Sequence, residues 1–302
     1  RFEDALFKCS STSDVLKLSE TSYFYDVYVN TIIPHVTQSS RNGSEDVAIE
    51  LYKYSTDKDI DSLYKLASRK YGTFSKQHKE LVEASKYINY YFPEDSISAI
   101  NTFVATFEYG SIYNEIDQSF GVGLDMYMGR DFEVYGLLNP QHFPFYRVKR
   151  FEPYNITPNC IKSYLNTKVF ENGKNSFLDY AIYEGKKLYG MDLLLPKLHD
   201  SLKMGYSSGQ IEWNRINEKN IWSYLNEKEV LFSTEKPTYM TNFFNDGPFT
   251  TPFGNESSPK TGAWVGWQIV RAYMDKYPEV SYKDLLADKD HLKIFKASGY
   301  KP

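Results

Sequence analysis

Histidine is the side chain most often used for zinc binding and general-base chemistry, so its spacing is the first guide to possible catalysis. The five histidines are His35, His78, His142, His199 and His291. No two of them lie within four residues of each other, so no helix can present a ligand pair on one face. We therefore expect no metal, no other cofactor and no catalytic residue, and we expect each histidine to lie at the surface or to cap a helix.

The stretch Gly205-Tyr206-Ser207-Ser208-Gly209 has the spacing of a nucleophile elbow. The serine of such an elbow needs a sharp turn from a strand into a helix. Residues 194–202, however, are amphipathic and predict a helix. In that context Gly205 should end one helix, Ser207 should cap the next, and Gln210 should complete a capping box. The sequence thus predicts a chemically inert Ser207.

Two further patterns could in principle carry chemistry. Gly121-Val122-Gly123 begins a glycine-rich pattern, but the third glycine and the following helix of a dinucleotide-binding fingerprint are missing. We expect close backbone packing in a strand there. The acidic pairs Glu115 with Asp117 and Asp125 with Asp131 could do acid–base work only if the fold brought their carboxylates together. We expect these side chains to be solvated loop carboxylates.

The elements that would position any site are mostly helical. Apolar residues recur every three or four positions in 59–66 and 74–92, which predicts two helices ending before Pro93. The pattern changes to that of strands in 96–107 and 120–127, with a polar gap between them. After Pro158 the helical period returns. The sequence predicts an α+β fold that is predominantly helical, with a small β-sheet.

Composition narrows the classes of function. With 41% hydrophobic residues the chain can bury a large core, yet no run approaches the roughly 18 apolar residues of a membrane span. A net charge of −4, with Lys and Glu mixed along the chain, predicts no nucleic-acid partner. Cys9 and Cys160 are too few and too far apart for a disulfide framework. We expect a water-soluble chain, mature or trimmed because it opens without Met, that forms a single domain over residues 1–302.

Two late segments could be core or binding surface. One side of 210–232 carries four apolar residues, Trp213, Ile216, Trp222 and Leu225. Together they predict a core stripe with a charged outer face. Residues 262–274 combine small residues with Trp264 and Trp267, so that another backbone could approach closely. Core packing explains this segment most simply, whereas a groove wall for a peptide or glycan is the alternative.

Six stretches along nearly the whole chain resemble the gliding-motility lipoprotein family GldB. These stretches are residues 1–4 (RFED), 90–93 (YYFP), 121–129 (GVGLDMYMG), 182–189 (IYEGKKLY), 217–222 (NEKNIW) and 258–273 (beginning SPKTG). The resemblance implies a lipoprotein of the bacterial cell envelope that faces the periplasm. It further implies association with gliding machinery and often with the type 9 secretion apparatus. Membrane attachment would occur only through an N-terminal lipid anchor outside these residues.

That family in turn is similar to HExxH zinc peptidases whose third metal ligand is a helical Glu. Tyr183-Glu184-Gly185-Lys186 resembles the third-ligand helix, so Glu184 stands where the metal-binding Glu would stand. Upstream, residues 158–165 contain neither a histidine nor the general-base Glu. The resemblance therefore implies a degenerate, gluzincin-like frame with its two ligand helices side by side. Tyr164, Tyr183 and Glu184 would face a shared cleft, with a Lys, an Arg or a hydroxyl serving Glu184.

Two classes of function remain open. The first is a non-catalytic envelope protein that binds a protein or peptide partner through Tyr164, Tyr183, Glu184 and Trp267. The second is a glycan-binding envelope lipoprotein, or a peptidase with displaced metal ligands. Packing in the core is the alternative for each of these four side chains, because aromatic residues at helical spacing are usually buried.

Overall fold

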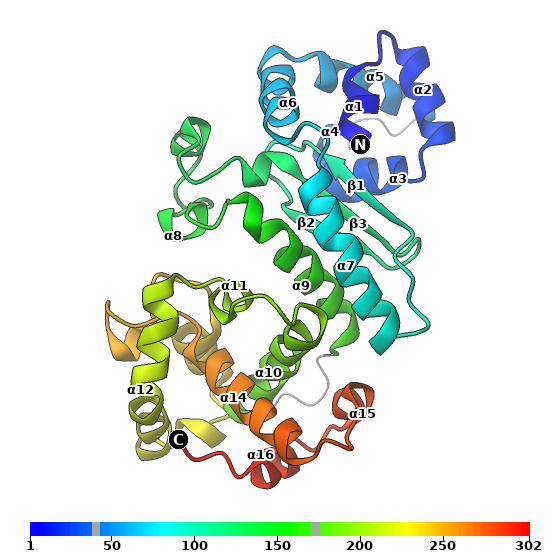
Figure 1. Cartoon of the computed structure of the whole chain (residues 1–302). Helices are drawn as coiled ribbons and strands as arrows, with labels where there is room; N and C mark the ends of the chain where they lie inside the picture. Colours follow the sequence, from blue (N-terminus) through cyan, green and yellow to red (C-terminus); the bar gives the residue numbers. More distant parts are fainter. Residues whose placement is uncertain (38–42, 171–175) are drawn as a thin grey trace. The chain divides into compact units, whose positions relative to one another are not determined.

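The computed structural model describes residues 1–37, 43–170 and 176–302, and it is mostly helical with one small sheet (Figure 1). The predicted α+β character, with helices dominant, is confirmed. The chain forms two compact units. Unit 1 comprises Arg1–Lys86 and Glu94–Ser163, and unit 2 comprises Tyr87–Pro93 and Tyr164–Pro302. The single domain over 1–302 stays a prediction. Among the described helices, none is long and apolar enough to cross a membrane.

Unit 1 begins with a run of helices. They are α1 (Phe2–Phe7), α2 (Thr12–Thr21), α3 (Tyr25–Val27), a π-turn at Tyr28–Ile32, α4 (Pro34–Thr37), α5 (Ser44–Thr56), α6 (Lys58–Tyr71) and α7 (Ser75–Tyr91). The helices predicted over 59–66 and 74–92 are confirmed as α6 and α7. The Asp57 side chain caps α6 by accepting the backbone N–H groups of Asp59 and Ile60. As predicted, α7 ends just before Pro93.

The small sheet of unit 1 has three strands in the order β1-β3-β2. These are β1 (Ala99–Phe103), β2 (Ser111–Asn114) and β3 (Ser119–Gly123), with β1 parallel and β2 antiparallel to β3. Both predicted strands exist but are shorter than expected, since residues 124–127 form a 3-10 turn. The polar gap between them also contains a strand, β2, which the sequence does not predict. β2 has only two apolar residues, Ile112 and Tyr113, so its sequence shows little strand pattern.

Gly123 confirms the expected close backbone packing in a strand. A Cβ at this position would lie 1.9 Å from the carbonyl oxygen of Tyr109. Because no side chain can occupy that space, only glycine allows the two backbones to approach this closely.

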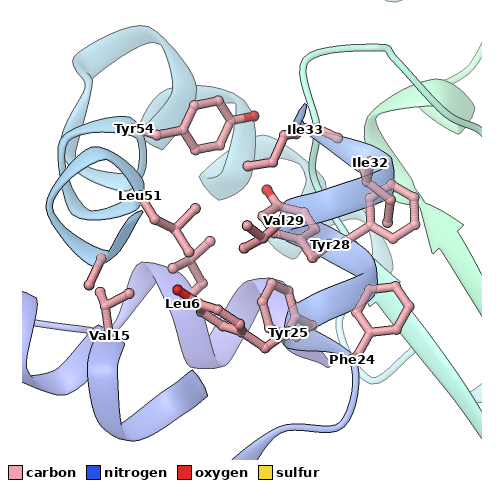
Figure 2. Close-up of a cluster of buried hydrophobic side chains, with 14 residues drawn as sticks. Leu6, Val15, Phe24, Tyr25, Tyr28, Val29, Ile32, Ile33, Leu51 and Tyr54 are labelled. Atoms are coloured by element: carbon pink, nitrogen blue, oxygen red, sulfur yellow. The ribbon is translucent and has the colours of Figure 1, made fainter. Parts of the chain in front are cut away.

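The core of unit 1 joins its N-terminal helices to the sheet, and Figure 2 shows Phe24, Tyr28 and Leu51 within it. The Phe2 ring lies 4.6 Å from the Tyr28 ring and 5.5 Å from the Phe24 ring, centroid to centroid. The Phe24 ring in turn stacks on Phe103 of β1 at 5.9 Å. The Tyr28 hydroxyl donates to the carbonyl oxygen of Val104 at 2.6 Å. The helices are therefore fixed against the end of β1 by ring packing and one buried hydrogen bond.

Asp125 is fully buried in the 3-10 turn Leu124–Tyr127, so the expectation of a solvated loop carboxylate was wrong. Its carboxylate accepts the backbone N–H of Phe107 at 2.6 Å and that of Ala105 at 3.3 Å. Thr106 and Phe107 have φ values of 50° and 69°, a region that costs non-glycine residues free energy. The carboxylate thus stabilises a strained turn after β1, because its oxygen atoms accept backbone N–H groups of that turn.

The rest of unit 1 and the whole of unit 2 are again helical. The structure places a 3-10 turn at Glu133–Leu137, α8 (Phe145–Val148), a 3-10 turn at Pro153–Asn155, α9 (Ile156–Lys168), α10 (Phe177–Leu194), α11 (Asp200–Met204), α12 (Ser208–Glu227), a 3-10 turn at Val230–Phe232, α13 (Lys236–Tyr239), a π-turn at Met240–Phe244, a 3-10 turn at Thr251–Phe253, α14 (Thr261–Lys276), α15 (Tyr282–Ala287) and α16 (His291–Ser298). The helix predicted over 194–202 is confirmed only at its two ends, because residues 195–199 are not helical: Pro196 cannot continue α10, and α11 begins at Asp200. Ile216, expected in a core stripe, is 70% exposed.

The buried Asp125 makes stability depend on pH. Burial raises the pKa of Asp125 to about 6, despite the N–H groups of Phe107 and Ala105, which favour the charged form. Between about pH 4 and pH 6 the folded state binds a proton that the unfolded state has released. The free energy of unfolding should therefore fall as pH rises through this window.

We predict that this fall is larger in the wild type than in Asp125→Asn, by about 3 kcal/mol for a shift of about two pKa units. Urea unfolding at a series of pH values measures it. All other titrating groups are shared by the two proteins and cancel in the difference. Two stability curves that run parallel from pH 4 to pH 6 would show that Asp125 is not the titrating group.

Candidate functional site

The centre of unit 2 is a close crossing of α10 and α14. A Cβ at Gly266 would lie 1.7 Å from the carbonyl oxygen of Ala181, and a Cβ at Gly185 would lie 2.3 Å from that of Gly266. Neither position can hold a side chain unless the helices separate. The prediction that small residues in 262–274 let another backbone approach is confirmed at Gly266. Gly185, singled out in the peptidase-like stretch, serves this helix packing.

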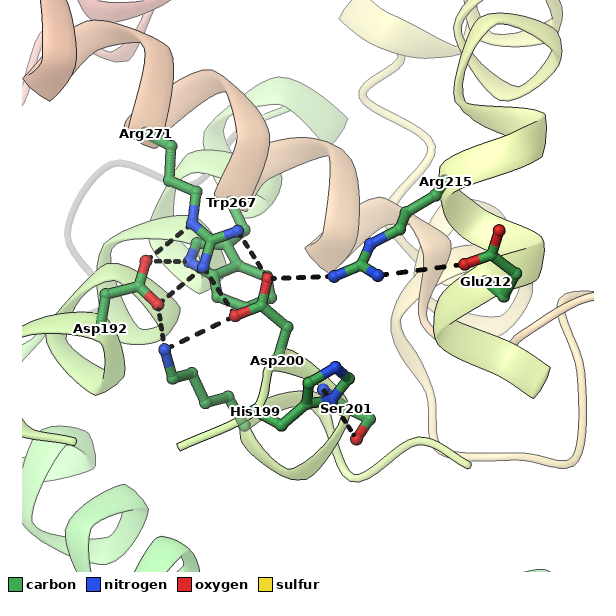
Figure 3. A network of polar contacts seen from close by, with 9 residues as sticks. Asp192, His199, Asp200, Ser201, Glu212, Arg215, Trp267 and Arg271 are labelled. Atoms are coloured by element: carbon green, nitrogen blue, oxygen red, sulfur yellow. Dashed lines mark hydrogen bonds and ion pairs between the residues drawn. The ribbon is translucent and has the colours of Figure 1, made fainter. Parts of the chain in front are cut away.

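A polar network lies beside the crossing (Figure 3). Arg271 of α14 forms a two-bond fork with Asp192, with Nε–Oδ2 and Nη2–Oδ1 distances of 2.7 Å. A second fork joins the same guanidinium to Asp200 at 3.0 Å. Lys203 donates to Asp192 at 2.7 Å, and the indole N–H of Trp267 donates to it at 2.9 Å. Such bidentate charge-assisted bonds fix both distance and orientation.

The Trp267 ring stacks against the guanidinium of this network. The Arg271 guanidinium carbon lies 3.6 Å from the centroid of the fully buried indole ring. This stacking is favourable because the ring face carries partial negative charge. Trp267, predicted as a binding residue, therefore has its N–H and its ring face both in use within the protein.

Arg271 and Asp200 stabilise each other in their charged forms. Burial lowers the pKa of Arg271, but hydrogen bonds to Asp192 and Asp200 outweigh it and raise the pKa above its ordinary value. Burial raises the pKa of Asp200, but the hydrogen bonds and charge of Arg271, with help from Lys203, bring it below the ordinary value. These groups stay ionised near neutral pH. They suit a structural role and not proton transfer, which needs a pKa near the working pH.

Glu184 and Tyr183 form a partly exposed cluster with Lys187 on α10. The Lys187 ammonium lies 2.5 Å from the Glu184 carboxylate, one helical turn away, and 4.4 Å from the centroid of the Tyr183 ring. The expectation that Glu184 would find a Lys, an Arg or a hydroxyl is confirmed by this ion pair. The Glu184 carboxylate is thus compensated within its own helix.

Tyr164 lies on α9, the helix expected from Pro158 onward. Its side chain is fully buried, and its ring packs edge-on against Phe92 at 5.8 Å. α9 meets α10 at Gly190, where a Cβ would lie 2.7 Å from Cδ2 of Leu165. Burial of Tyr164 and Trp267 agrees with the packing alternative for both. A cleft shared by Tyr164, Tyr183 and Glu184 stays a prediction. Because Tyr164 is fully buried, it could contact a partner only if a change in the structure exposed it.

The histidines lie on different elements of the described chain. Within residues 1–37, 43–170 and 176–302, no three His, Cys, Asp or Glu side chains gather closely enough to hold a metal ion. His199 caps α11, as expected for a capping histidine. The expected surface position was wrong for His291, whose side chain is buried. Its Nδ1 atom lies 3.1 Å from Oδ1 of Asp179. Burial, together with the charge of Lys186, lowers the pKa of His291, so its neutral form is favoured.

The turn at Gly205 to Gln210 matches its prediction. Gly205 ends α11 with φ 72° and ψ 34°, the left-handed conformation that favours glycine. Ser207 caps α12, and Gln210 completes the capping box by accepting the Ser207 N–H at 3.0 Å. Ser207 therefore precedes a helix and follows another, which is not the context of a nucleophile elbow.

A surface cavity in unit 2 was not predicted. It measures about 390 Å³ and is lined by Leu225, Asn226, Glu229, Leu231 and Phe232. Phe232 is 58% exposed at its border. The sequence signal for this cavity is the apolar run 230–232, which directly follows the charged residues 227–229.

A row of four aromatic rings begins at this cavity. We use the name aromatic row for Phe232, Phe295, Trp222 and Tyr300. Successive ring centroids lie 6.4, 5.8 and 5.2 Å apart. All four side chains are exposed or half-buried. These rings come from α12, the 3-10 turn after it, α16 and the C-terminal end of the chain, so they lie side by side only in the folded protein.

Comparisons with known proteins give one result. The family model described as Gliding motility protein GldB matches residues 1–302. No functionally curated protein and no solved structure matches the chain. The match covers both units, including the helix crossing, the polar network and the aromatic row.

Arg271 provides a test of the network. We predict that Arg271→Met lowers the free energy of unfolding by about 3 kcal/mol, because two largely buried carboxylates lose their main donor. Arg271→Lys should be intermediate, since it keeps the charge but loses both forks. Chemical unfolding measures these changes.

The matched control is Lys65→Met, which breaks the exposed ion pair with Asp61 on α6. It should change stability by no more than about 0.5 kcal/mol. Equal, small effects of Arg271→Met and Lys65→Met would show that the network contributes no more than a surface pair.

Proposed function

The chain belongs to the gliding motility protein GldB family, a family of gliding-motility lipoproteins, and we propose that it is a non-catalytic envelope component that binds a protein or peptide partner. The partner would belong to the gliding machinery or the type 9 secretion apparatus, as the resemblance in the sequence implies. The observation that carries the proposal is the cavity of unit 2 with the aromatic row beside it.

The cavity suits one apolar side chain of a peptide. Leu225, Leu231 and Phe232 give it an apolar lining, and a volume of about 390 Å³ is large enough for such a group. An exposed aromatic ring at the border of a pocket is typical of residues that dominate protein interfaces. Burying Phe232 under a partner would remove a large apolar surface from water.

Glu229 adds a polar determinant to the cavity. Its backbone has φ 54° and ψ 24°, the left-handed conformation that strains a residue with a side chain. Such strain is concentrated at functional sites. Among the described residues, no Lys or Arg forms an ion pair with Glu229. We therefore expect the partner to place a basic group next to its apolar anchor.

The proposal also includes a relic peptidase frame. Glu184 would stand in the place of a third metal ligand, and it is compensated by Lys187. Tyr183 and Glu184 are half-buried, so they could contribute to a partner surface on α10.

A glycan is the second candidate ligand, and the aromatic row is the observation that favours it. Sugars bind to aromatic rings, but they also need several polar groups that fix their orientation. Asn226 and Glu229 are the two polar residues among those that line the cavity. This lining favours a peptide over a glycan.

Photo-cross-linking in living cells tests the proposed surface. We predict that a benzoyl-phenylalanine introduced in place of Phe232 gives a discrete adduct with an envelope protein. The side chain is exposed, so the fold should tolerate the change. The matched control is the same replacement at Ile216, which is 70% exposed on α12 and lies outside the aromatic row.

An adduct at 232 that is missing at 216 supports the surface. A smear that collapses on treatment with a peptidoglycan hydrolase would instead identify a glycan. The proposed surface is wrong if position 232 gives no adduct in motile cells, or if both positions give the same one.

A further inference from the structure

A second exposed surface lies in unit 1, around α8 (Figure 1). The segment that carries this surface is held in place by aromatic side chains that pack on one another. The Tyr135 ring packs against Phe151 at 5.0 Å and against Phe107 at 5.6 Å, and Phe143 lies 6.2 Å from Phe151. The Tyr135 hydroxyl also donates to the carbonyl oxygen of Asp125 at 2.6 Å. The segment is therefore fixed to the buried turn of unit 1 and is not a loose loop.

Two apolar side chains of this segment point away from that support. Leu137 is 85% exposed and Phe145 is 73% exposed. Each lies beside residues that are firmly packed, since Tyr135 and Val148 are buried. The segment thus has a sufficient apolar interior and still presents two large apolar side chains to water, which costs solvation free energy.

The charge of the segment is unlike that of the whole chain. Residues 134–151 contain two Arg, one Lys and no Asp or Glu, in a chain whose net charge is −4. Arg147 and Lys149 are exposed. The Lys149 ammonium lies 4.4 Å from the centroid of the Phe145 ring, so one basic and one apolar group are presented together.

We propose that residues 134–151 form a membrane-docking surface for anionic phospholipid. Leu137 and Phe145 enter the boundary between headgroups and acyl chains, and Arg147 and Lys149 lie over the phosphates. Aromatic and apolar groups beside basic ones are the combination that binds such interfaces. This contact is additional to the lipid anchor, which the family resemblance implies as the only membrane attachment.

Two observations favour a bilayer as the occupant. The chain belongs to a lipoprotein family, so an anchor would hold it at a membrane, where even a weak second contact is strengthened by effective concentration. A single acyl or basic contact binds reversibly, and two together bind stably. The exposed side chains also protrude, and a fluid bilayer accepts protruding groups without needing a matching pocket. The inference is independent of the cavity in unit 2.

Vesicle flotation with the chain of residues 1–302, without an anchor, tests the proposal. The protein should float with vesicles of phosphatidylethanolamine and phosphatidylglycerol, but not with vesicles of phosphatidylcholine alone. Binding should weaken at about 0.5 M salt, because exposed charges are then screened. Arg147→Gln with Lys149→Gln should lower the partition coefficient roughly 10- to 30-fold. Phe145→Ser and Leu137→Ser should each lower it roughly tenfold.

Matched controls separate this surface from general charge and hydrophobicity. Lys76→Gln with Lys79→Gln removes two exposed charges from α7 of the same unit, and Tyr23→Ser removes a side chain that is 95% exposed. Both control variants should bind as the wild type does, and all variants should unfold at the wild-type temperature. The proposal is overturned if the wild type does not float with anionic vesicles, or if the control variants lose as much binding as the test variants.

Penetration is measured separately with Phe145→Trp. Because the chain has four native tryptophans, the readout is the difference between the emission of this variant and that of the wild type. This difference should shift to shorter wavelength on anionic vesicles and should be quenched by lipids brominated in the acyl chain. Flotation without quenching would show that the segment lies above the headgroups and would refute the insertion of Phe145.

Discussion

The contact between Gly185 and Gly266 is the constraint on which unit 2 depends. Two helices can approach to this distance only where neither carries a side chain, and a Cβ at Gly266 would lie 1.7 Å from a carbonyl oxygen of α10. Because α10 and α14 are so close, Asp192 of one helix reaches both Trp267 and Arg271 of the other. The crossing is therefore the reason that a charged network can be satisfied inside a mostly apolar unit.

Both units use a carboxylate of low exposure to hold a structure that would otherwise be costly. In unit 1, Asp125 satisfies backbone N–H groups of a strained turn. In unit 2, Asp192 and Asp200 accept four hydrogen bonds from one guanidinium. The donors and acceptors of these clusters are largely used within the protein, as is usual for buried polar groups. The side chains that remain for partners are the exposed ones, which are aromatic at Phe232 and both aromatic and basic near α8.

Local features were predictable from the sequence, and long-range ones were not. The helices α6 and α7 and the capping box of Ser207 depend on residues within a few positions of each other, so their patterns are complete in the sequence. The burial of Asp125 depends on a turn about 20 residues away in the chain. From the sequence alone an acidic side chain is expected to be exposed to solvent. The short strand β2 lacked a pattern because its pairing with β3 replaces intrinsic preference.

The candidate site divides in the same way. Gly185 and Glu184 were singled out through a resemblance to peptidases, and the structure gives them physical roles in packing and in an ion pair on α10. For Trp267 the sequence leaves core packing and a groove wall open, and the structure stacks its buried ring against Arg271, because only the crossing of α10 and α14 determines which side of the indole is covered. The aromatic row joins residues 222 and 300, a separation over which periodicity carries no information.

Hydrogen exchange of Gly266→Ala tests the role of the helix crossing most directly. A methyl group there must push α10 and α14 apart, at a cost of several kcal/mol. Backbone amides of both helices should lose protection, while those of β1 and β3 in unit 1 should keep it. Gly136→Ala is the matched control, since a Cβ at Gly136 meets no atom within 4 Å. Unchanged protection of α10 and α14 in Gly266→Ala would contradict the account.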